Sequence, residues 1–159
     1  MSDVYLRNGS LTRDEIIGAF PHGPKAVLVD GVKVDTGMIV GHYHFDSKTN
    51  ELFADHFPGQ PIMMGVLMIE IIQQVALAGV AVGNIIKMVK AGGVESAKYH
   101  QSIYDGDDIT ITIYGFRQDH EDKRLYYVSG KIFRGNVISA EGLICDATFR
   151  AYIVMKEKK

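Results

Sequence analysis

A long run of apolar residues, from about Met64 to Lys90, constrains this chain of 159 residues more than any other feature. The run is apolar on nearly every face and does not alternate as a half-buried strand would, and its length favours a helix. Gly92 and Gly93 follow the run and are expected to end that helix. A helix that is apolar all round must be enclosed, so the rest of the chain has to supply its cover.

The same run could be mistaken for a membrane span, because Gly65 to Ile86 is mostly apolar. Polar residues interrupt it, however: Glu70, Gln73, Gln74 and Asn84. An ionisable group near the centre of a bilayer is costly. The pattern therefore favours a helix buried inside protein, where these polar groups find partners, and we expect no membrane association.

The residues on either side of the apolar run have the patterns of strands. Ile109 to Tyr114, for example, alternates apolar residues with Thr and Tyr, as in a sheet with one covered face. A short capped helix is expected over about 12–20, and strands over about 26–30, 32–45, 94–104, 107–117, 123–134 and 137–153. No linker or repeat divides residues 1–159. We therefore expect one domain of the α+β class, a long central helix wrapped by a curved antiparallel sheet.

Composition argues against several functional classes. The formal net charge of −2 gives no reason to expect a nucleic-acid partner or an anionic membrane surface. Cys145 is the single cysteine and lies in an alternating run, so it is expected to be a half-buried strand thiol. The first residues lack the basic and apolar segments of a signal peptide. Together these features favour the cytoplasm.

One stretch, residues 54–74, holds the side chains that could carry chemistry. His56 lies in a loop that two prolines make irregular, just before the helix. Glu70 lies on the otherwise apolar helix, where burial favours a protonated carboxyl that can donate its proton. Gln74, one turn later on the same face, can orient this carboxyl. Gly65 begins the helix, and its free N–H, with no Cβ beside it, can receive a substrate oxygen.

These groups suit the removal of water from a 3-hydroxyacyl thioester. That reaction needs a base for the C2 proton, an acid for the C3 hydroxyl and a donor for the enolate-like oxygen. His56, Glu70 and the Gly65 amide can supply them. Residue types alone leave other interpretations open, since Glu70 could be a structural carboxyl and His56 a capping or packing residue. His42 and His44 would share one strand face, but no third ligand with suitable spacing is evident, so no metal is expected.

A longer pattern goes beyond these residue types. Its members are His56, Phe57, Pro58, Gly59, Pro61, Met63, Gly65, Val66, Leu67, Glu70 and Gln74. With this spacing the stretch resembles the signature of the β-hydroxyacyl-(acyl-carrier-protein) dehydratases of bacterial type II fatty-acid synthesis, the FabZ type. The resemblance extends to other segments of the chain, namely Pro21-His22, Leu28-Val29-Asp30, Lys98-Tyr99 and Asp105-Gly106-Asp107.

The resemblance implies a hot-dog fold and a lyase in which His56 and Glu70 are the catalytic pair. The oxyanion and substrate contacts would come from Gly65, Gln74, Val66 and Phe57. The resemblance implies no cofactor or metal, and a substrate carried on the phosphopantetheine arm of an acyl-carrier protein. Family members are homodimers or trimers of dimers, whose active sites take the histidine and the glutamate from different subunits. We therefore expect conversion of (3R)-3-hydroxyacyl-acyl-carrier-protein into the trans-2-enoyl thioester.

Two departures from the family pattern border the predicted site. Met64 stands where the family usually has proline, and Asp55 where glycine is common. They suggest a divergent member, serving fatty-acid synthesis or the synthesis of polyketides and other specialised acyl chains. Two other functions fit the same fold: an acyl thioesterase, in which the helix carboxyl would activate water, and a non-catalytic acyl-binding subunit.

Overall fold

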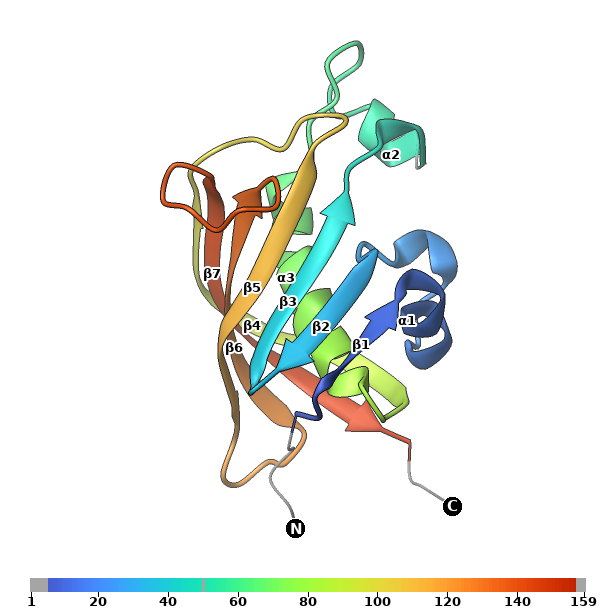
Figure 1. Ribbon diagram of the computed structural model, residues 1–159, viewed down its shortest axis with the longest axis vertical. Helices are drawn as coiled ribbons and strands as arrows, with labels where there is room; N and C mark the ends of the chain where they lie inside the picture. The colour runs from blue at the N-terminus through green and yellow to red at the C-terminus, as the bar shows by residue number, and fades with distance from the viewer. Residues whose placement is uncertain (1–5, 50, 157–159) are drawn as a thin grey trace.

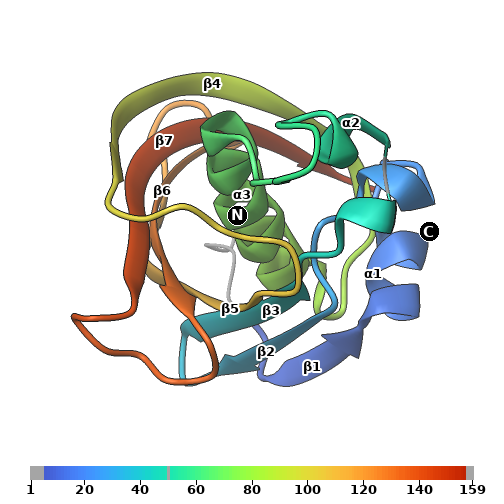
Figure 2. The ribbon, with the colours of Figure 1, turned by 90° about the horizontal axis from the view of Figure 1, so that it is seen from above.

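The computed structural model describes residues 6–49 and 51–156, and its centre is one long helix, α3 (Gly65–Ala81). A strongly curved sheet encloses this helix (Figure 1). Seen from above, β4, β7, β6, β5, β3 and β2 follow one another around α3, and α1 lies on the remaining side (Figure 2). This arrangement is the hot-dog fold, so the predicted α+β architecture is confirmed.

The sheet has seven strands within the described residues, in the order β1-β2-β3-β5-β6-β7-β4, and neighbouring strands are antiparallel. The strands are β1 (Gly9–Thr12), β2 (Gly31–Asp35), β3 (Met38–His44), β4 (Ile86–Tyr99), β5 (Asp108–Gln118), β6 (Leu125–Arg134) and β7 (Leu143–Met155). The other helices are α1 (Arg13–Ala19) and α2 (Glu51–Ala54), with 3₁₀ turns at Pro24–Ala26 and Ser47–Thr49.

The central helix is shorter than the apolar run predicted. It ends at Ala81, and Gly83 follows with a φ of +78°, a left-handed conformation that glycine adopts without strain. The rest of the run enters β4, where Gly92 and Gly93 lie at a register shift against β7 instead of ending a helix. Along the described chain, no helix combines the length and apolar character needed to cross a membrane.

Residues 26–30 do not form the strand that their sequence predicts. Val27, Leu28 and Val29 are buried, but they follow the 3₁₀ turn as irregular chain. The backbone N–H of Leu28 donates to the side chain of Gln74 at 2.7 Å, so a side chain takes the place of a neighbouring strand. The strand prediction is wrong because the side-chain amide of Gln74, on α3, forms the hydrogen bond with this backbone that a neighbouring strand would otherwise form.

Glycines on two strands allow the sheet to approach the central helix closely. A Cβ added to Gly41 of β3 would lie 2.5 Å from Cγ2 of Val75, and one added to Gly130 of β6 would lie 2.4 Å from Cγ2 of Ile72. Neither distance is possible between real carbon atoms without a shift of one partner. The missing side chains on β3 and β6 therefore set how tightly the sheet closes on α3.

Replacing Gly41 with Ala should lower the free energy of unfolding by about 1–3 kcal/mol, because the added carbon overpacks the contact with Val75. Chemical denaturation measures this change. Gly18→Ala is the matched control, since its Cβ would meet nothing within 4 Å and alanine favours the helix in which it lies. Val75→Ala in the Gly41→Ala background should recover part of the loss. A Gly41→Ala protein as stable as the parent would contradict the close approach.

Cys145 lies on β7 and is fully buried, deeper than the half-buried thiol predicted. Burial raises the pKa of the thiol to about 12, so at neutral pH it is protonated as well as inaccessible. A disulfide reagent should therefore label the folded protein at the rate at which it unfolds, and the denatured protein at once. Rapid stoichiometric labelling of the native protein would contradict this burial.

Candidate active site

His56 is held in a closed loop between α2 and α3. The backbone N–H of Ile62 donates to the carbonyl oxygen of His56 at 2.7 Å, and the Nδ1 atom of His56 lies 3.0 Å from the carbonyl oxygen of Ile62. A carbonyl oxygen only accepts hydrogen bonds, so Nδ1 carries the ring hydrogen and Nε2 keeps its lone pair. The ring can thus accept a proton at Nε2. The His56–Phe57 peptide bond in this loop is cis.

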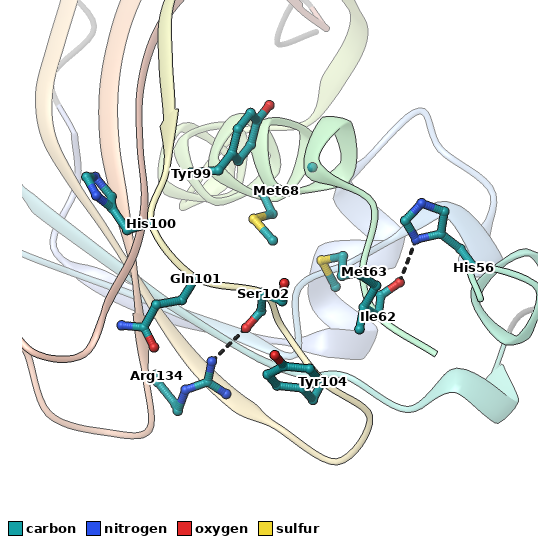
Figure 3. Close-up of a pocket in the computed structure, with 11 residues that line it drawn as sticks. His56, Ile62, Met63, Met68, Tyr99, His100, Gln101, Ser102, Tyr104 and Arg134 are labelled. Atoms are coloured by element: carbon teal, nitrogen blue, oxygen red, sulfur yellow. Dashed lines mark hydrogen bonds between the residues drawn. The ribbon is translucent and has the colours of Figure 1, made fainter. Parts of the chain in front are cut away.

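A cavity of about 560 Å³ opens beside His56 (Figure 3). Its walls come from the loop and first turn of α3, from the end of β4 with the chain that follows it, and from β6. The lining residues are His56, Ile62, Met63, Gly65, Met68, Tyr99, His100, Gln101, Ser102, Tyr104 and Arg134. The N–H of Met63 donates to the carbonyl oxygen of Ile103 at 2.9 Å and so fastens two of the walls together.

Gly65 brings the start of α3 to this cavity, beneath the ring of Tyr99. A Cβ at Gly65 would lie 3.2 Å from Cε1 and Cζ of Tyr99, which is tighter than an ordinary contact. The N-cap residue, Met64, makes no side-chain hydrogen bond to the helix. The N–H of Leu67 donates to the carbonyl oxygen of Met64 at 3.0 Å. Among the described residues no side-chain cap engages the N–H groups of Gly65 and Val66, which lie at the positive end of the helix dipole.

Gln74 fixes the orientation of Glu70. The Oε1 atom of Gln74 accepts the N–H of Leu28, so its Nε2 group is the donor. Nε2 donates to the carbonyl oxygen of Ala26 and to Oε1 of Glu70, both at 2.8 Å, which uses both amide hydrogens. Since Oε1 of Glu70 accepts this hydrogen bond, Oε2 is the oxygen that would hold the hydrogen whenever the carboxyl is protonated. Gln74 itself is buried, so its amide depends on these hydrogen bonds within the protein.

Glu70 is less buried than its apolar helix suggested, because its side chain is 34% exposed in the single chain. Its second polar neighbour is His22, in the turn after α1, whose Nε2 atom lies 3.9 Å from Oε1 of Glu70. The sequence marks His22 only as part of a family-like segment. The contact between the two residues is tertiary and leaves no local pattern.

Glu70, one member of the predicted catalytic pair, does not line the cavity beside His56. His56 and Gly65 both line the cavity of Figure 3. Glu70 and Gln74 are absent from its lining and contact residues 22–28 instead. The structure thus brings the predicted residues together in two groups rather than one.

Phe57 and Val66 lie outside the lining of this cavity. The ring of Phe57 stacks on the imidazole of His56, with 4.4 Å between the ring centroids, yet the residue is 57% exposed. Val66 is 68% exposed. The substrate contacts expected of these two residues stay predictions.

The sequence did not reveal the far wall of the cavity. Arg134 reaches it from β6 and donates hydrogen bonds to the carboxylate of Asp107 and, at 2.6 Å, to the carbonyl oxygen of Ser102. The Cζ atom of Arg134 lies over the ring of Tyr104, 5.7 Å from the centroid of that ring. These contacts join residues about thirty positions apart, so only the strand order brings them together.

The two histidines of β3 do not form a metal site. Nδ1 of His44 lies 2.8 Å from Oδ1 of Asp108, and this hydrogen bond raises the pKa of His44. His42 lies 3.4 Å from the hydroxyl of Thr110. Across the described residues, no three of the His, Cys, Asp and Glu side chains are grouped as a metal would need.

The model of the ApeI-like family, described as ApeI dehydratase, matches residues 33–139 of the chain, which include the His56 loop and α3. The chain belongs to this dehydratase family. It is also similar to enzymes named 3-hydroxyacyl-[acyl-carrier-protein] dehydratase FabZ. The one from Erythrobacter litoralis is 32% identical over 84% of this chain and 89% of its own. The one from Clostridium acetobutylicum is 34% identical over 65% of this chain and 76% of its own.

Solved structures agree with the hot-dog fold of this dehydratase. An uncharacterized protein, PH1136 from Pyrococcus horikoshii, superposes with a TM-score of 0.56 at 15% identity, covering 82% of this chain and 86% of that one. The E. coli PaaI protein from the phenylacetic acid degradation operon gives 0.50 at 11% identity, covering 77% and 78%. Identities this low support the shared fold and nothing more specific.

Gln74→Leu should lower the free energy of unfolding by about 2–4 kcal/mol, because it leaves the buried N–H of Leu28 unpaired and removes the hydrogen bonds to the carbonyl oxygen of Ala26 and to Glu70. Thermal or chemical denaturation would measure the loss. Gln73→Leu, the same change one residue earlier on the partly buried face, is the control and should cost less than about 1 kcal/mol. Equal losses in the two variants would contradict the network described for Gln74.

Proposed function

We propose that the protein is a 3-hydroxyacyl-[acyl-carrier-protein] dehydratase that converts a (3R)-3-hydroxyacyl thioester into the trans-2-enoyl thioester, with His56 as base and Glu70 as acid. The observation that carries the proposal is the hydrogen-bond geometry of this pair. His56 has its Nε2 lone pair free, and Glu70 is oriented so that its proton belongs on Oε2. Membership of the dehydratase family supports the same reaction.

In the proposed reaction, Nε2 of His56 takes the proton from C2 of the substrate. The electron pair of that C–H bond forms the C2–C3 double bond, the C3–O bond breaks, and Oε2 of Glu70 gives its proton to the departing hydroxyl, which leaves as water. The N–H of Gly65 stabilises the negative charge that develops on the thioester oxygen. The step leaves an imidazolium and a carboxylate, and one proton must pass back to Glu70 before the next turnover.

We infer that the working site forms between two copies of the chain, so that His56 of one subunit acts with Glu70 of the other. The absence of Glu70 from the lining of the cavity beside His56 supports this arrangement. So does β4, an edge strand paired only with β7 in the described sheet, most of whose residues are exposed. A free edge of this length invites pairing with another chain. A dimer, or a trimer of such dimers, would cover it.

The substrate we propose is an acyl chain carried by the phosphopantetheine arm of an acyl-carrier protein, as the names of the relatives suggest. The cavity at His56 is open to solvent and has both polar and apolar walls, which suits a thioester delivered on a flexible arm. We expect the pathway to be fatty-acid synthesis or a related synthesis of specialised acyl chains. A cytoplasmic location fits Cys145, the single cysteine, which is free and buried.

The first test supplies the purified protein with a 3-hydroxyacyl thioester and follows enoyl absorbance together with free thiol. Enoyl product without thiol release is expected, whereas thiol release alone would indicate an acyl thioesterase. His56→Ala and Glu70→Gln should each lower kcat by about 10²–10⁴-fold, the usual worth of a positioned base or acid. Glu121→Gln, in the exposed turn between β5 and β6, is the control and should keep the parent rate. Unchanged turnover in Glu70→Gln would sink the assignment of the acid.

Mixing the two inactive variants tests the shared site. When His56→Ala and Glu70→Gln subunits are refolded together, half of the dimers should be mixed, and each mixed dimer has one intact site. Activity should therefore return to about a quarter of the parent rate. Each variant refolded alone is the control. Recovery of no activity, in mixtures shown to contain mixed dimers, would mean that each site lies within one chain.

A further inference from the structure

His22 has an environment that packing alone does not explain. Its Nε2 atom lies 3.9 Å from Oε1 of Glu70, and its Nδ1 atom is buried with no hydrogen-bond partner among the described residues. Its ring packs on Phe20, with 5.4 Å between the centroids. A buried ring nitrogen without a partner is costly, so an apolar residue would fill this place at lower cost. The cost suggests that the other ring nitrogen has a use.

We propose that His22 is a positioning residue that acts through Glu70, by directing an N–H at the oxygen on which negative charge develops during turnover. The proposal rests on the proposed role of Glu70 as the acid. In the neutral ring the hydrogen belongs on Nε2, because the described residues offer Nδ1 no acceptor. The ring therefore presents a donor to Glu70.

The 3.9 Å distance is too long for a hydrogen bond to the protonated acid. When Oε2 gives its proton away, however, the charge spreads over both carboxylate oxygens, and Oε1 becomes a stronger acceptor. Gln74 already donates to Oε1 at 2.8 Å. A second donor that closes in only as charge appears stabilises the transition state more than the ground state. His22 should thus raise kcat and leave KM nearly unchanged.

The other charged groups near this turn are engaged elsewhere or exposed. Arg13 of α1 binds the carboxylate of Asp30 at 3.2 Å and the carbonyl oxygens of Val29 and Pro24. Lys25 is exposed on the 3₁₀ turn. Within the described chain, the ion-pair geometry of His22 involves Glu70 alone.

Four variants test the proposal with the thioester assay. His22→Phe keeps the ring volume against Phe20 and removes the donor, so kcat should fall by about tenfold with KM changed by less than about twofold. His22→Gln can place an amide N–H where Nε2 was and should keep more than about a third of the parent kcat. His22→Asn is too short to reach Glu70 and should behave as His22→Phe. His120→Phe, in the exposed turn after β5, is the matched control and should keep the parent kcat.

Coupling to Glu70 is measured by adding His22→Phe to Glu70→Gln. The residual rate of Glu70→Gln should fall no further, because the donor has lost the charge on which it acts. A further tenfold loss in that background would overturn the proposal. So would a parent-like kcat in both His22→Phe and His22→Asn, or equal losses in His22→Gln and His22→Asn.

The outcomes also separate this proposal from the proposed function. If Glu70→Gln is inactive while His22→Phe keeps the parent kcat, Glu70 remains the acid and only the role of His22 falls. If Glu70→Gln keeps full activity, the acid is wrongly assigned and the role of His22 falls with it. Should His22→Phe fail to fold, as circular dichroism would show, the comparison of His22→Gln with His22→Asn decides alone, because both are polar and differ by one methylene.

Discussion

The buried amide of Gln74 is the interaction on which the rest of this site depends. Its oxygen accepts from the backbone of Leu28, and its nitrogen donates to the backbone of Ala26 and to Glu70. All three partners are thereby fixed by one side chain, which uses both of its amide hydrogens. The same amide supports irregular chain at residues 26–30 and orients the carboxyl of Glu70 through its oxygen Oε1. The stability of this segment and the orientation of Glu70 therefore depend on one side chain.

The position of this amide is itself set by the way the sheet closes on the helix. Gly41 and Gly130 remove the side chains that would hold β3 and β6 away from α3. The helix consequently lies close to the sheet, and its residues Glu70 and Gln74 contact residues 22–28 of the N-terminal segment. Just before the helix begins, the N–H of Met63 donates to the carbonyl oxygen of Ile103, and this hydrogen bond joins the loop of His56 to the chain that follows β4. The imidazole of His56, in the loop, and the carboxyl of Glu70, on the helix, thus have different surroundings.

The sequence predicts what depends on short-range pattern and misses what depends on contacts between distant segments. The apolar run predicts the buried helix, and the spacing of His56, Gly65, Glu70 and Gln74 predicts the motif. The same apolar character hides the change from helix to strand after Gly83, because a buried helix and a strand in a sheet are both rich in apolar residues. The wall at Arg134 and the approach of His22 to Glu70 have no signal in the local sequence, since both arise only when the sheet is assembled.

The hydrogen bonds of Gln74 cross the boundary of the segment that matches the family model. The family match begins at residue 33, yet Ala26 and Leu28, the backbone partners of Gln74, lie before it. The environment of Glu70 is therefore completed by a segment outside the matched residues 33–139, and the FabZ-like residues Leu28-Val29-Asp30 lie in that segment. Residues 27–30 are irregular chain rather than a strand. A change in this segment would alter the hydrogen bonds around Glu70 while residues 56–74 stay unchanged.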